Sequence, residues 1–184
     1  MAEDIKDIHK KLVDECKKGS RKAQQEIYKL YCKAMFNTCC RIMNSREEAE
    51  DMLQEAFVDA FTKIEMFRND STFGAWLKQI VVNKCINEVK RKKPDIHFFD
   101  DISNLNYLDD SKDKYEREYE QLTVNRIKSA VELLPTGGKM VFNLYMFEGL
   151  SHQEIAESMN ISESTSKTQF MRAKIRIREI LNSN

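Results

Sequence analysis

Apolar residues recur every three or four positions along most of the first 93 residues, a period that predicts amphipathic helices rather than strands. Small polar residues, a glycine and a proline interrupt this period at intervals. The interruptions predict four successive helices. Their predicted limits are Gly19 for the end of the first, Ser20 and Asn44 for the second, Ser45 and Phe67 for the third, and Ser71 or Thr72 and Pro94 for the fourth.

The C-terminal part continues the helical period in shorter elements. Pro135 ends the first of them, because its ring restricts the residue before it, and three more follow the pair Gly137 and Gly138. The predicted elements are residues 122–134, 141–147, 151–159 and 163–181. Before them, residues 94–120 lose the period and hold nine Asp or Glu against three Lys or Arg, which is typical of an acidic linker.

The last two predicted elements have the layout of a helix-turn-helix. Ser151 and Glu154 form a capping box at the start of the first helix. Asn160 stands where the tight turn needs a residue that tolerates positive φ, and Ser162 caps the second helix. The predicted buried stripe of that second helix consists of Phe170, Ala173, Ile177 and Ile180 or Leu181.

The remaining face of the second helix is polar and basic, with five Lys or Arg and no acid between residues 167 and 178. A helix fits the major groove of DNA, where its first residues reach base edges and later cations neutralise phosphates. A basic helix face is often only solvated, but together with the turn chemistry it favours DNA binding. The candidate residues on this face are Ser164, Thr165, Lys167, Thr168, Gln169 and Arg172.

The composition excludes several function classes. Gly and Pro total seven of 184 residues, and 30 Lys and Arg balance 30 Asp and Glu, so neither a turn-rich β fold nor a polycation is indicated. Five cysteines without a CxxC pair and three separated histidines predict no metal site, cofactor or disulfide framework. No glycine-rich phosphate loop, HExxH or Gly-x-Ser-x-Gly occurs, which argues against an enzyme. The N-terminus lacks an unbroken apolar stretch, and we expect a cytoplasmic protein.

Charge is unevenly distributed within the first part of the chain. Residues 47–59 hold six acids and no base, which is typical of a solvated helix or of a surface that docks a basic protein. Residues 78–93 hold six bases and one acid, a balance that would attract DNA. Phe73 and Trp76 stand near the start of this basic segment, where they either belong to the core or stack on unpaired bases.

In combination these segments resemble the extracytoplasmic-function (ECF, group IV) sigma factors of the sigma-70 family of bacterial RNA polymerase. The resemblance is carried by DMLQEAFVDAF, FGAWLKQIVVNKCINEVKRKK and LPTGGKMVFNLYMFEGLSHQEIAESMNISESTSKTQFMRAKIRIREIL, and it covers residues 27–93 and 122–181. It implies an all-α protein of two helical domains. These are a region 2-like domain at 1–93 and a region 4-like helix-turn-helix domain at 121–184, joined by the acidic linker at 94–120.

The resemblance also implies partners: the RNA polymerase core, promoter DNA and an anti-sigma factor. The residues that would dock on the clamp helices of the largest polymerase subunit are Asp51, Gln54, Glu55 and Phe57. Those that would recognise and open the −10 element are Arg68, Asn69, Asp70, Ser71, Thr72, Trp76, Asn83, Lys84, Asn87, Lys90 and Arg91. Those that would read the duplex −35 element are Ser162, Ser164, Thr165, Lys167, Thr168, Gln169 and Arg172.

Three features depart from the family pattern. Val82 stands where an arginine often precedes the asparagine at Asn83, and Ser166 stands where valine is common in the recognition helix. Gly137 and Gly138 replace commoner helix formers after Pro135.

Two other functions stay open. A stand-alone helix-turn-helix regulator would bind a symmetric operator without polymerase. A helical adaptor would bridge proteins through its acidic and basic faces and would support no promoter-dependent transcription.

Overall fold

The computed structural model describes residues 2–43, 45–92, 96 and 124–183, and every regular element among them is a helix. This confirms the all-α prediction. The chain divides into two compact units, Met1–Pro94 and Asp95–Asn184. Apart from Ile96, the predicted linker at 94–120 lies outside the described residues, as do Asn44, Lys93 and Leu122.

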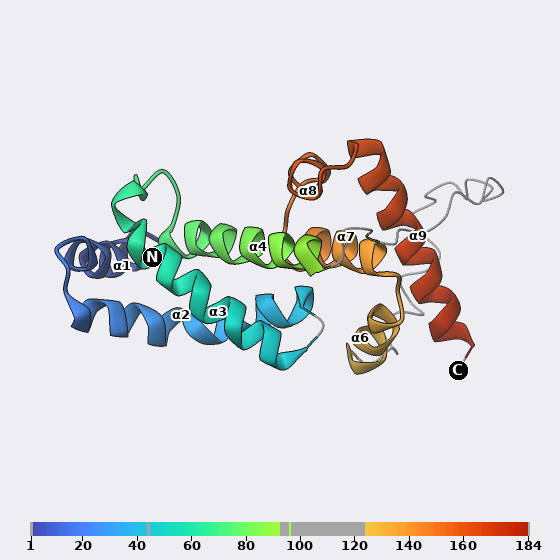
Figure 1. Cartoon of the computed structure of the whole chain (residues 1–184), viewed down its shortest axis with the longest axis horizontal. Coiled ribbons are helices and arrows are strands. Elements are labelled where there is room, and N and C mark those ends of the chain that lie inside the picture. Colours follow the sequence, from blue (N-terminus) through green and yellow to red (C-terminus); the bar gives the residue numbers. More distant parts are fainter. Residues whose placement is uncertain (1, 44, 93–95, 97–123, 184) are drawn as a thin grey trace. The chain divides into compact units, whose positions relative to one another are not determined.

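The first unit is a bundle of long helices (Figure 1). Helices α2, α3 and α4 pack on one another, and α1 packs on α2 and on a short 3₁₀ helix, η1, that follows α3. The bounds are Ala2–Lys17 for α1, Arg21–Ile42 for α2, Arg46–Thr62 for α3, Ile64–Met66 for η1 and Phe73–Lys92 for α4.

The predicted start signals of these helices are confirmed by their hydrogen bonds. The Ser20 hydroxyl accepts from the backbone N–H of Ala23 at 3.3 Å, and the Ser45 hydroxyl accepts from that of Glu48 at 3.1 Å. Thr72 Oγ1 accepts from the third residue of α4 at 3.3 Å. Each bond satisfies one of the amide donors that a helix leaves unpaired in its first turn.

The third helix ends earlier than its apolar period predicts. Regular α-helix stops at Thr62, and Ile64 and Phe67 belong to or directly follow η1 rather than α3. Both are nonetheless buried, at 4% and 3% exposure. A 3₁₀ turn has three residues per turn, so it keeps positions 64 and 67 on one side and preserves the apolar period beyond the α-helix.

The second unit packs three short helices against one long one. The bounds are Val124–Glu132 for α6, Thr136–Met146 for α7, His152–Met159 for α8 and Glu163–Asn182 for α9. Helix α9 contacts all three others. The buried cluster between them contains Ala130, Val131, Leu134, Phe142, Ala173, Ile177 and Leu181.

Helix α7 begins five residues before the predicted start at residue 141. Pro135 is its N-cap and its carbonyl accepts from the backbone N–H of Lys139 at 2.8 Å, so the helix runs through Gly137 and Gly138. Both glycines are buried. A glycine inside a helix costs about 1 kcal/mol relative to alanine, a cost that burial of the helix can offset.

Candidate nucleic-acid and protein interfaces

The helix-turn-helix predicted for the second unit is present in its details. The Ser151 hydroxyl accepts from the N–H of Glu154 at 3.2 Å, while the Glu154 carboxylate accepts from the N–H of Ser151 at 2.8 Å. These bonds to Ser151 hold the pKa of Glu154 below its usual range. Asn160 adopts the left-handed conformation with φ 55° and ψ 49°, and the Ser162 hydroxyl accepts from the N–H of Thr165 at 3.0 Å. Helices α8 and α9 are therefore joined as the capping pattern predicted.

A polar contact joins α8 to α9 at the position where the family pattern favours valine. Ser166 is fully buried, and its hydroxyl lies 2.9 Å from Nδ1 of His152. The His152 ring stacks on Tyr145 with centroids 4.4 Å apart and meets the edge of Phe170 at 5.7 Å. Burial of the ring, helped by the nearby charge of Lys167, holds the pKa of His152 below its usual range. Sequence reasoning missed this contact, because the two residues lie 14 positions apart and the burial of Ser166 cannot be read from the chain.

The structure corrects one residue of the predicted DNA-reading face of α9. Gln169 is only 4% exposed, because it follows the buried Ser166 by three residues and precedes the buried Ala173 by four. Residues at these spacings share one face of a helix. The prediction that Gln169 contacts DNA is therefore wrong, and its side chain belongs to the packed face.

The other predicted residues of this face remain accessible. Ser162, Ser164 and Lys167 are exposed, and Thr165, Thr168 and Arg172 are partly exposed. The Ser162 hydroxyl is held in the cap, where it also lies 2.8 Å from the Ser164 hydroxyl. Lys167 pairs with Glu163 at 2.6 Å, one turn earlier on the same helix.

In the first unit, α3 presents the predicted acidic face. Asp51, Gln54 and Glu55 are exposed and share one side of the helix by their spacing. Phe57 is 3% exposed and packs edge-on against Tyr28 with centroids 4.8 Å apart, so the prediction that it contacts a partner directly is wrong. The apolar residue on the exposed face is Val58, at 64% exposure. The spacing 51, 54, 55, 58 is the signal that would have identified it.

A groove of about 390 Å³ runs between α3 and α4. It brings Glu55 of the predicted protein-docking set together with four residues of the predicted −10 set, two of them the exposed asparagines Asn83 and Asn87. The complete lining is Met52, Glu55, Asp59, Lys63, Ile80, Asn83, Lys84, Asn87, Glu88 and Arg91. Residues assigned to two different partners therefore share one surface.

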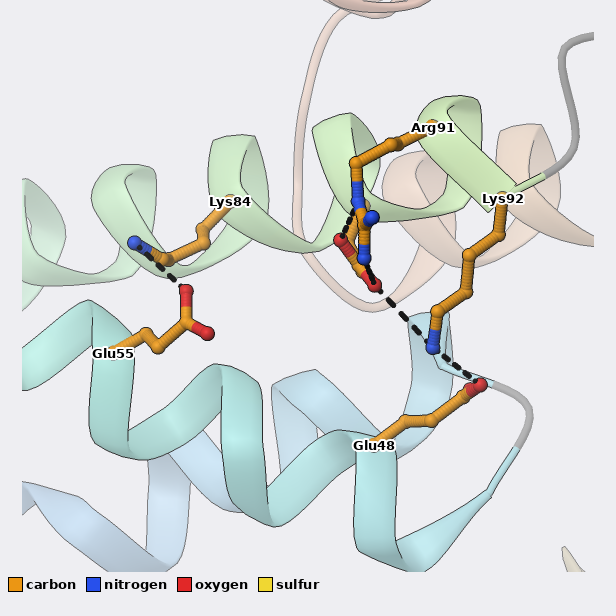
Figure 2. Close-up of polar contacts among 6 residues, drawn as sticks. Glu48, Glu55, Lys84, Arg91 and Lys92 are labelled. Atoms are coloured by element: carbon orange, nitrogen blue, oxygen red, sulfur yellow. Dashed lines mark hydrogen bonds and ion pairs between the residues drawn. The ribbon is translucent and has the colours of Figure 1, made fainter.

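Ion pairs cross this groove (Figure 2). Lys84 Nζ lies 2.7 Å from a carboxylate oxygen of Asp59 and 3.2 Å from one of Glu55. The hydrogen bond from Lys84 holds the pKa of Asp59 below its usual range. The acidic residues of α3 thus neutralise part of the positive charge on α4.

A second cluster of ion pairs lies near the end of α4 (Figure 2). Lys92 Nζ lies 2.8 Å from Glu48 of α3 and 3.3 Å from Glu88 of its own helix. Arg91 donates two bonds, of 2.7 and 2.8 Å, to the two oxygens of Glu88. Chiefly through the bond from Arg91, the pKa of Glu88 is lowered to about 2. Three basic residues of the segment 78–93, Lys84, Arg91 and Lys92, are therefore paired with carboxylates.

The polar loop before α4, residues 68–72, is exposed along its whole length. Asn69 adopts a positive φ of 62°, which gives the loop a sharp turn. Trp76 is partly exposed beside it and packs on Phe67 and Phe73, with centroids 5.4 and 5.6 Å apart. The indole thus belongs to the edge of the core.

Lys90, another residue of the predicted −10 set, is partly buried on α4.

Metal binding and membrane insertion make distinct demands on the residues that the structure describes. Within that part of the chain, no three His, Cys, Asp or Glu side chains gather closely enough to hold a metal ion. No helix there is both long and apolar enough to cross a membrane.

Comparison with known proteins gives matches over both units. The family models "Sigma-70 region 2" and "Sigma-70, region 4" match residues 27–94 and 125–177. The ECF RNA polymerase sigma factor SigW of Bacillus subtilis is 30% identical over 94% of this chain and 96% of its own length. The ECF RNA polymerase sigma-E factor of Haemophilus influenzae is 30% identical over 95% and 94%. The fold is similar to that of the sigma factor RpoE solved in complex with the anti-sigma factor NepR from Bartonella quintana, at TM-score 0.55 and 21% identity over 86% of this chain and 96% of that one.

Proposed function

The chain belongs to the sigma-70 family as an ECF RNA polymerase sigma factor, and we propose that its two units divide promoter recognition between them. A sigma factor binds the polymerase core and directs it to promoters. The observation that carries the proposal is the pairing, in one chain, of a capped helix-turn-helix with a unit that sets an acidic helix against a basic one. The proposed division is residues 1–93 for the core and the −10 element, 94–120 as the acidic tether, and 121–184 for the −35 element. Placement in group IV of the family is part of the same proposal.

The exposed face of α3 is the proposed docking surface for the polymerase core. It consists of Asp51, Gln54, Glu55 and Val58, which lie on one side of the helix and are all exposed. Carboxylates around a small apolar centre suit a partner helix with a basic rim, because such an interface combines charge complementarity with burial of apolar area. The clamp helices of the largest polymerase subunit are the proposed partner.

The loop at residues 68–72 and the groove side of α4 are the proposed −10 surface. The loop is exposed and polar, and Trp76, four residues after it, is partly exposed, as stacking on an unpaired base requires. Asn83 and Asn87 line the groove further along α4. Lys84, Lys90 and Arg91 would contact the phosphates of the same strand.

Helix α9 is the proposed reader of the −35 element. Its first turns present Ser164, Thr165, Lys167 and Thr168, and Arg172 follows one turn later. The first turns of a recognition helix lie deepest in the major groove, so these side chains would contact base edges while Arg172 would contact phosphate. Ser162 serves this surface as the cap of the helix.

Three further properties complete the proposal. Because the Bartonella quintana relative was solved with an anti-sigma factor, an anti-sigma protein is proposed as a partner of this chain also. The chain is proposed to act in the cytoplasm, where its polymerase and promoters are. It is proposed to supply no catalytic group, so that nucleotide addition belongs to the polymerase.

The deciding experiment is reconstituted transcription. The purified chain is mixed with sigma-free core polymerase and a library of genomic fragments, and the 5′ ends of the transcripts are mapped. The expected result is initiation at discrete positions preceded by two shared sequence elements. Absence of directed initiation would reject the proposal. A symmetric site bound tightly without polymerase would instead favour the stand-alone regulator, and core binding without promoter-dependent transcripts would favour the adaptor.

A further inference from the structure

The residue that leads into the −10 loop is held by a side chain from α1. Lys17 Nζ donates a hydrogen bond of 2.8 Å to the backbone carbonyl of Phe67, the last residue before the loop. The same ammonium lies 5.9 Å from the centroid of the Phe67 ring. Lys17 is partly buried, and it precedes the segment matched by the region 2 family model, which starts at residue 27. Its exposed neighbour Lys18 makes no comparable contact among the described residues.

Phe67 transmits this contact to both sides of the loop. It is 3% exposed and packs on Phe73 and Trp76, the residues that follow the loop, with centroids 5.6 and 5.4 Å apart. The loop therefore leaves and re-enters the helical bundle through one aromatic cluster, whose first member is fixed by Lys17.

The far end of the loop is held separately, by α2. The Phe73 ring meets the edge of Tyr31 with centroids 5.5 Å apart. The next residue is Gly74, where an added Cβ would lie only 2.9 Å from the Tyr31 ring. This close approach leaves the start of α4 little freedom. The direction of the loop then depends on its other end, where a charge-assisted hydrogen bond fixes the Phe67 carbonyl.

We propose that Lys17 is a positioning residue for −10 recognition: it fixes the carbonyl of Phe67 and thereby the direction in which residues 68–72 are presented to the DNA strand. The inference rests on the proposed function of the loop. Without the ammonium, a carbonyl in a partly buried place loses its donor, and the loop samples more directions. The selectivity among −10 sequences falls as a result, whereas the docking face on α3 is untouched.

The test uses holoenzyme assembled from the full chain and core polymerase. The variant K17M keeps the length of the side chain and removes the donor, K18M is the matched control on the exposed neighbour, and K17R restores a donor. A promoter library randomised across the −10 element is transcribed, and the base preference at each position is measured by sequencing. For K17M we expect roughly a tenfold loss of preference at one or more positions, with unchanged capture of the core. K18M should keep the wild-type profile, and K17R should recover most of it.

The outcomes separate this inference from the function on which it rests. An unchanged preference profile for K17M would overturn it, and so would a loss of core capture as large as the loss of preference, because that would show a merely structural role. If K17M does not fold, K17L, which also lacks a donor, carries the same comparison. Substitution of Arg68 and Asp70 by alanine tests the loop itself. If that double variant also keeps the wild-type profile, the proposed −10 role of the loop fails; if it alone changes the profile, only the role of Lys17 fails.

Discussion

The basic residues of α4 and those of α9 are paired in different ways. On α4, Lys84 and Lys92 reach across to carboxylates of another helix, at Asp59 and Glu48. On α9, Lys167 pairs with Glu163 at 2.6 Å and Arg176 pairs with Glu179 at 2.8 Å, and both pairs lie within the helix. Exposed pairs one turn apart contribute only about 0.3–0.5 kcal/mol, so DNA can displace them easily. Pairs between helices also belong to the packing of α3 on α4.

The two proposed DNA surfaces therefore differ in which ion pairs their cations must break before they bind DNA. On the reading face of α9, Lys167 would give up one exposed pair within its own helix. Lys84 of α4 must exchange α3 carboxylates for phosphates, whereas Arg91 pairs with Glu88 of its own helix. Glu55, one partner of Lys84, lies on the proposed polymerase-docking face. Binding of the polymerase to α3 and release of Lys84 to bind DNA would thus both involve Glu55. This provides a physical reason for a subunit that binds its promoter mainly as part of the polymerase.

The largest expected effect comes from reversing the charge of the α3 face. Asp51→Lys with Glu55→Lys should lower core capture by a factor on the order of 100, because a complementary charge becomes repulsive. The measurement is the dissociation constant of the full chain for sigma-free core polymerase. Glu15→Lys with Glu65→Lys is the matched control, since it makes the same change in net charge at two exposed acids of the first unit that lie outside α3. Core capture that falls equally in both variants, or in neither, would contradict the assigned docking face.

A smaller and opposite effect is expected when the α3 carboxylates are neutralised without reversal. Glu55→Gln with Asp59→Asn leaves Lys84 without its ionic partners, and the free chain should bind single-stranded DNA several-fold more tightly. Freeing one cation should steepen the dependence of log affinity on log salt concentration by about 0.7. Fluorescence anisotropy across a salt series measures both. The control Glu15→Gln with Glu65→Gln removes two exposed acids of the same unit and changes net charge equally, and an identical gain from it would show that overall charge alone is responsible.

The third expected effect tests α9, where Lys167 and Arg176 form ion pairs within the helix. Arg172→Ala should lower the affinity of the chain for duplex −35 DNA and reduce the salt slope by about 0.9, the share of one phosphate contact on B-form DNA. Lys128→Ala, an exposed cation on α6, serves as the control and should leave the slope unchanged. A slope that is the same for Arg172→Ala and wild type would remove Arg172 from the phosphate contacts.

Local chemistry was enough to predict the helices and their junctions. The capping box at Ser151, the left-handed Asn160 and the caps at Ser20 and Ser45 depend on residues within four positions of one another. Such signals can be read directly from the chain. The prediction of the start of α7 was wrong because the helix contains two glycines, which intrinsic propensity disfavours but tertiary burial tolerates.

The wrong site residues share a different cause, the phase of a helix relative to its neighbours. Gln169 was counted on the polar face that the predicted apolar stripe of α9 leaves over. Only the packing of α9, with Ser166 buried against His152, shows that the side of Gln169 is buried. Phe57 was taken for a contact residue, whereas the adjacent Val58 occupies the exposed face. The opposite charges of residues 47–59 and 78–93 were visible in the sequence. That they face each other across a groove depends on how α3 packs on α4, which no local pattern contains.

The smallest expected effect concerns the contact between His152 of α8 and Ser166 of α9. The pKa of His152 is lowered in the folded chain by burial, so the unfolded chain binds a proton at a higher pH than the folded one. The stability that neutral His152 contributes is therefore fully present above its unfolded pKa of about 6.5. It declines as the pH falls from there through the folded pKa. Thermal melting of the full chain should show a midpoint about 2 °C lower at pH 5.5 than at pH 7.5 on account of this group. His152→Gln, which keeps a polar partner for Ser166 but does not titrate, should lose that part of the difference. If the melting midpoint depends on pH identically in both proteins, His152 makes no contribution to that dependence. Its lowered pKa would then have no effect on the packing of α9 against α8.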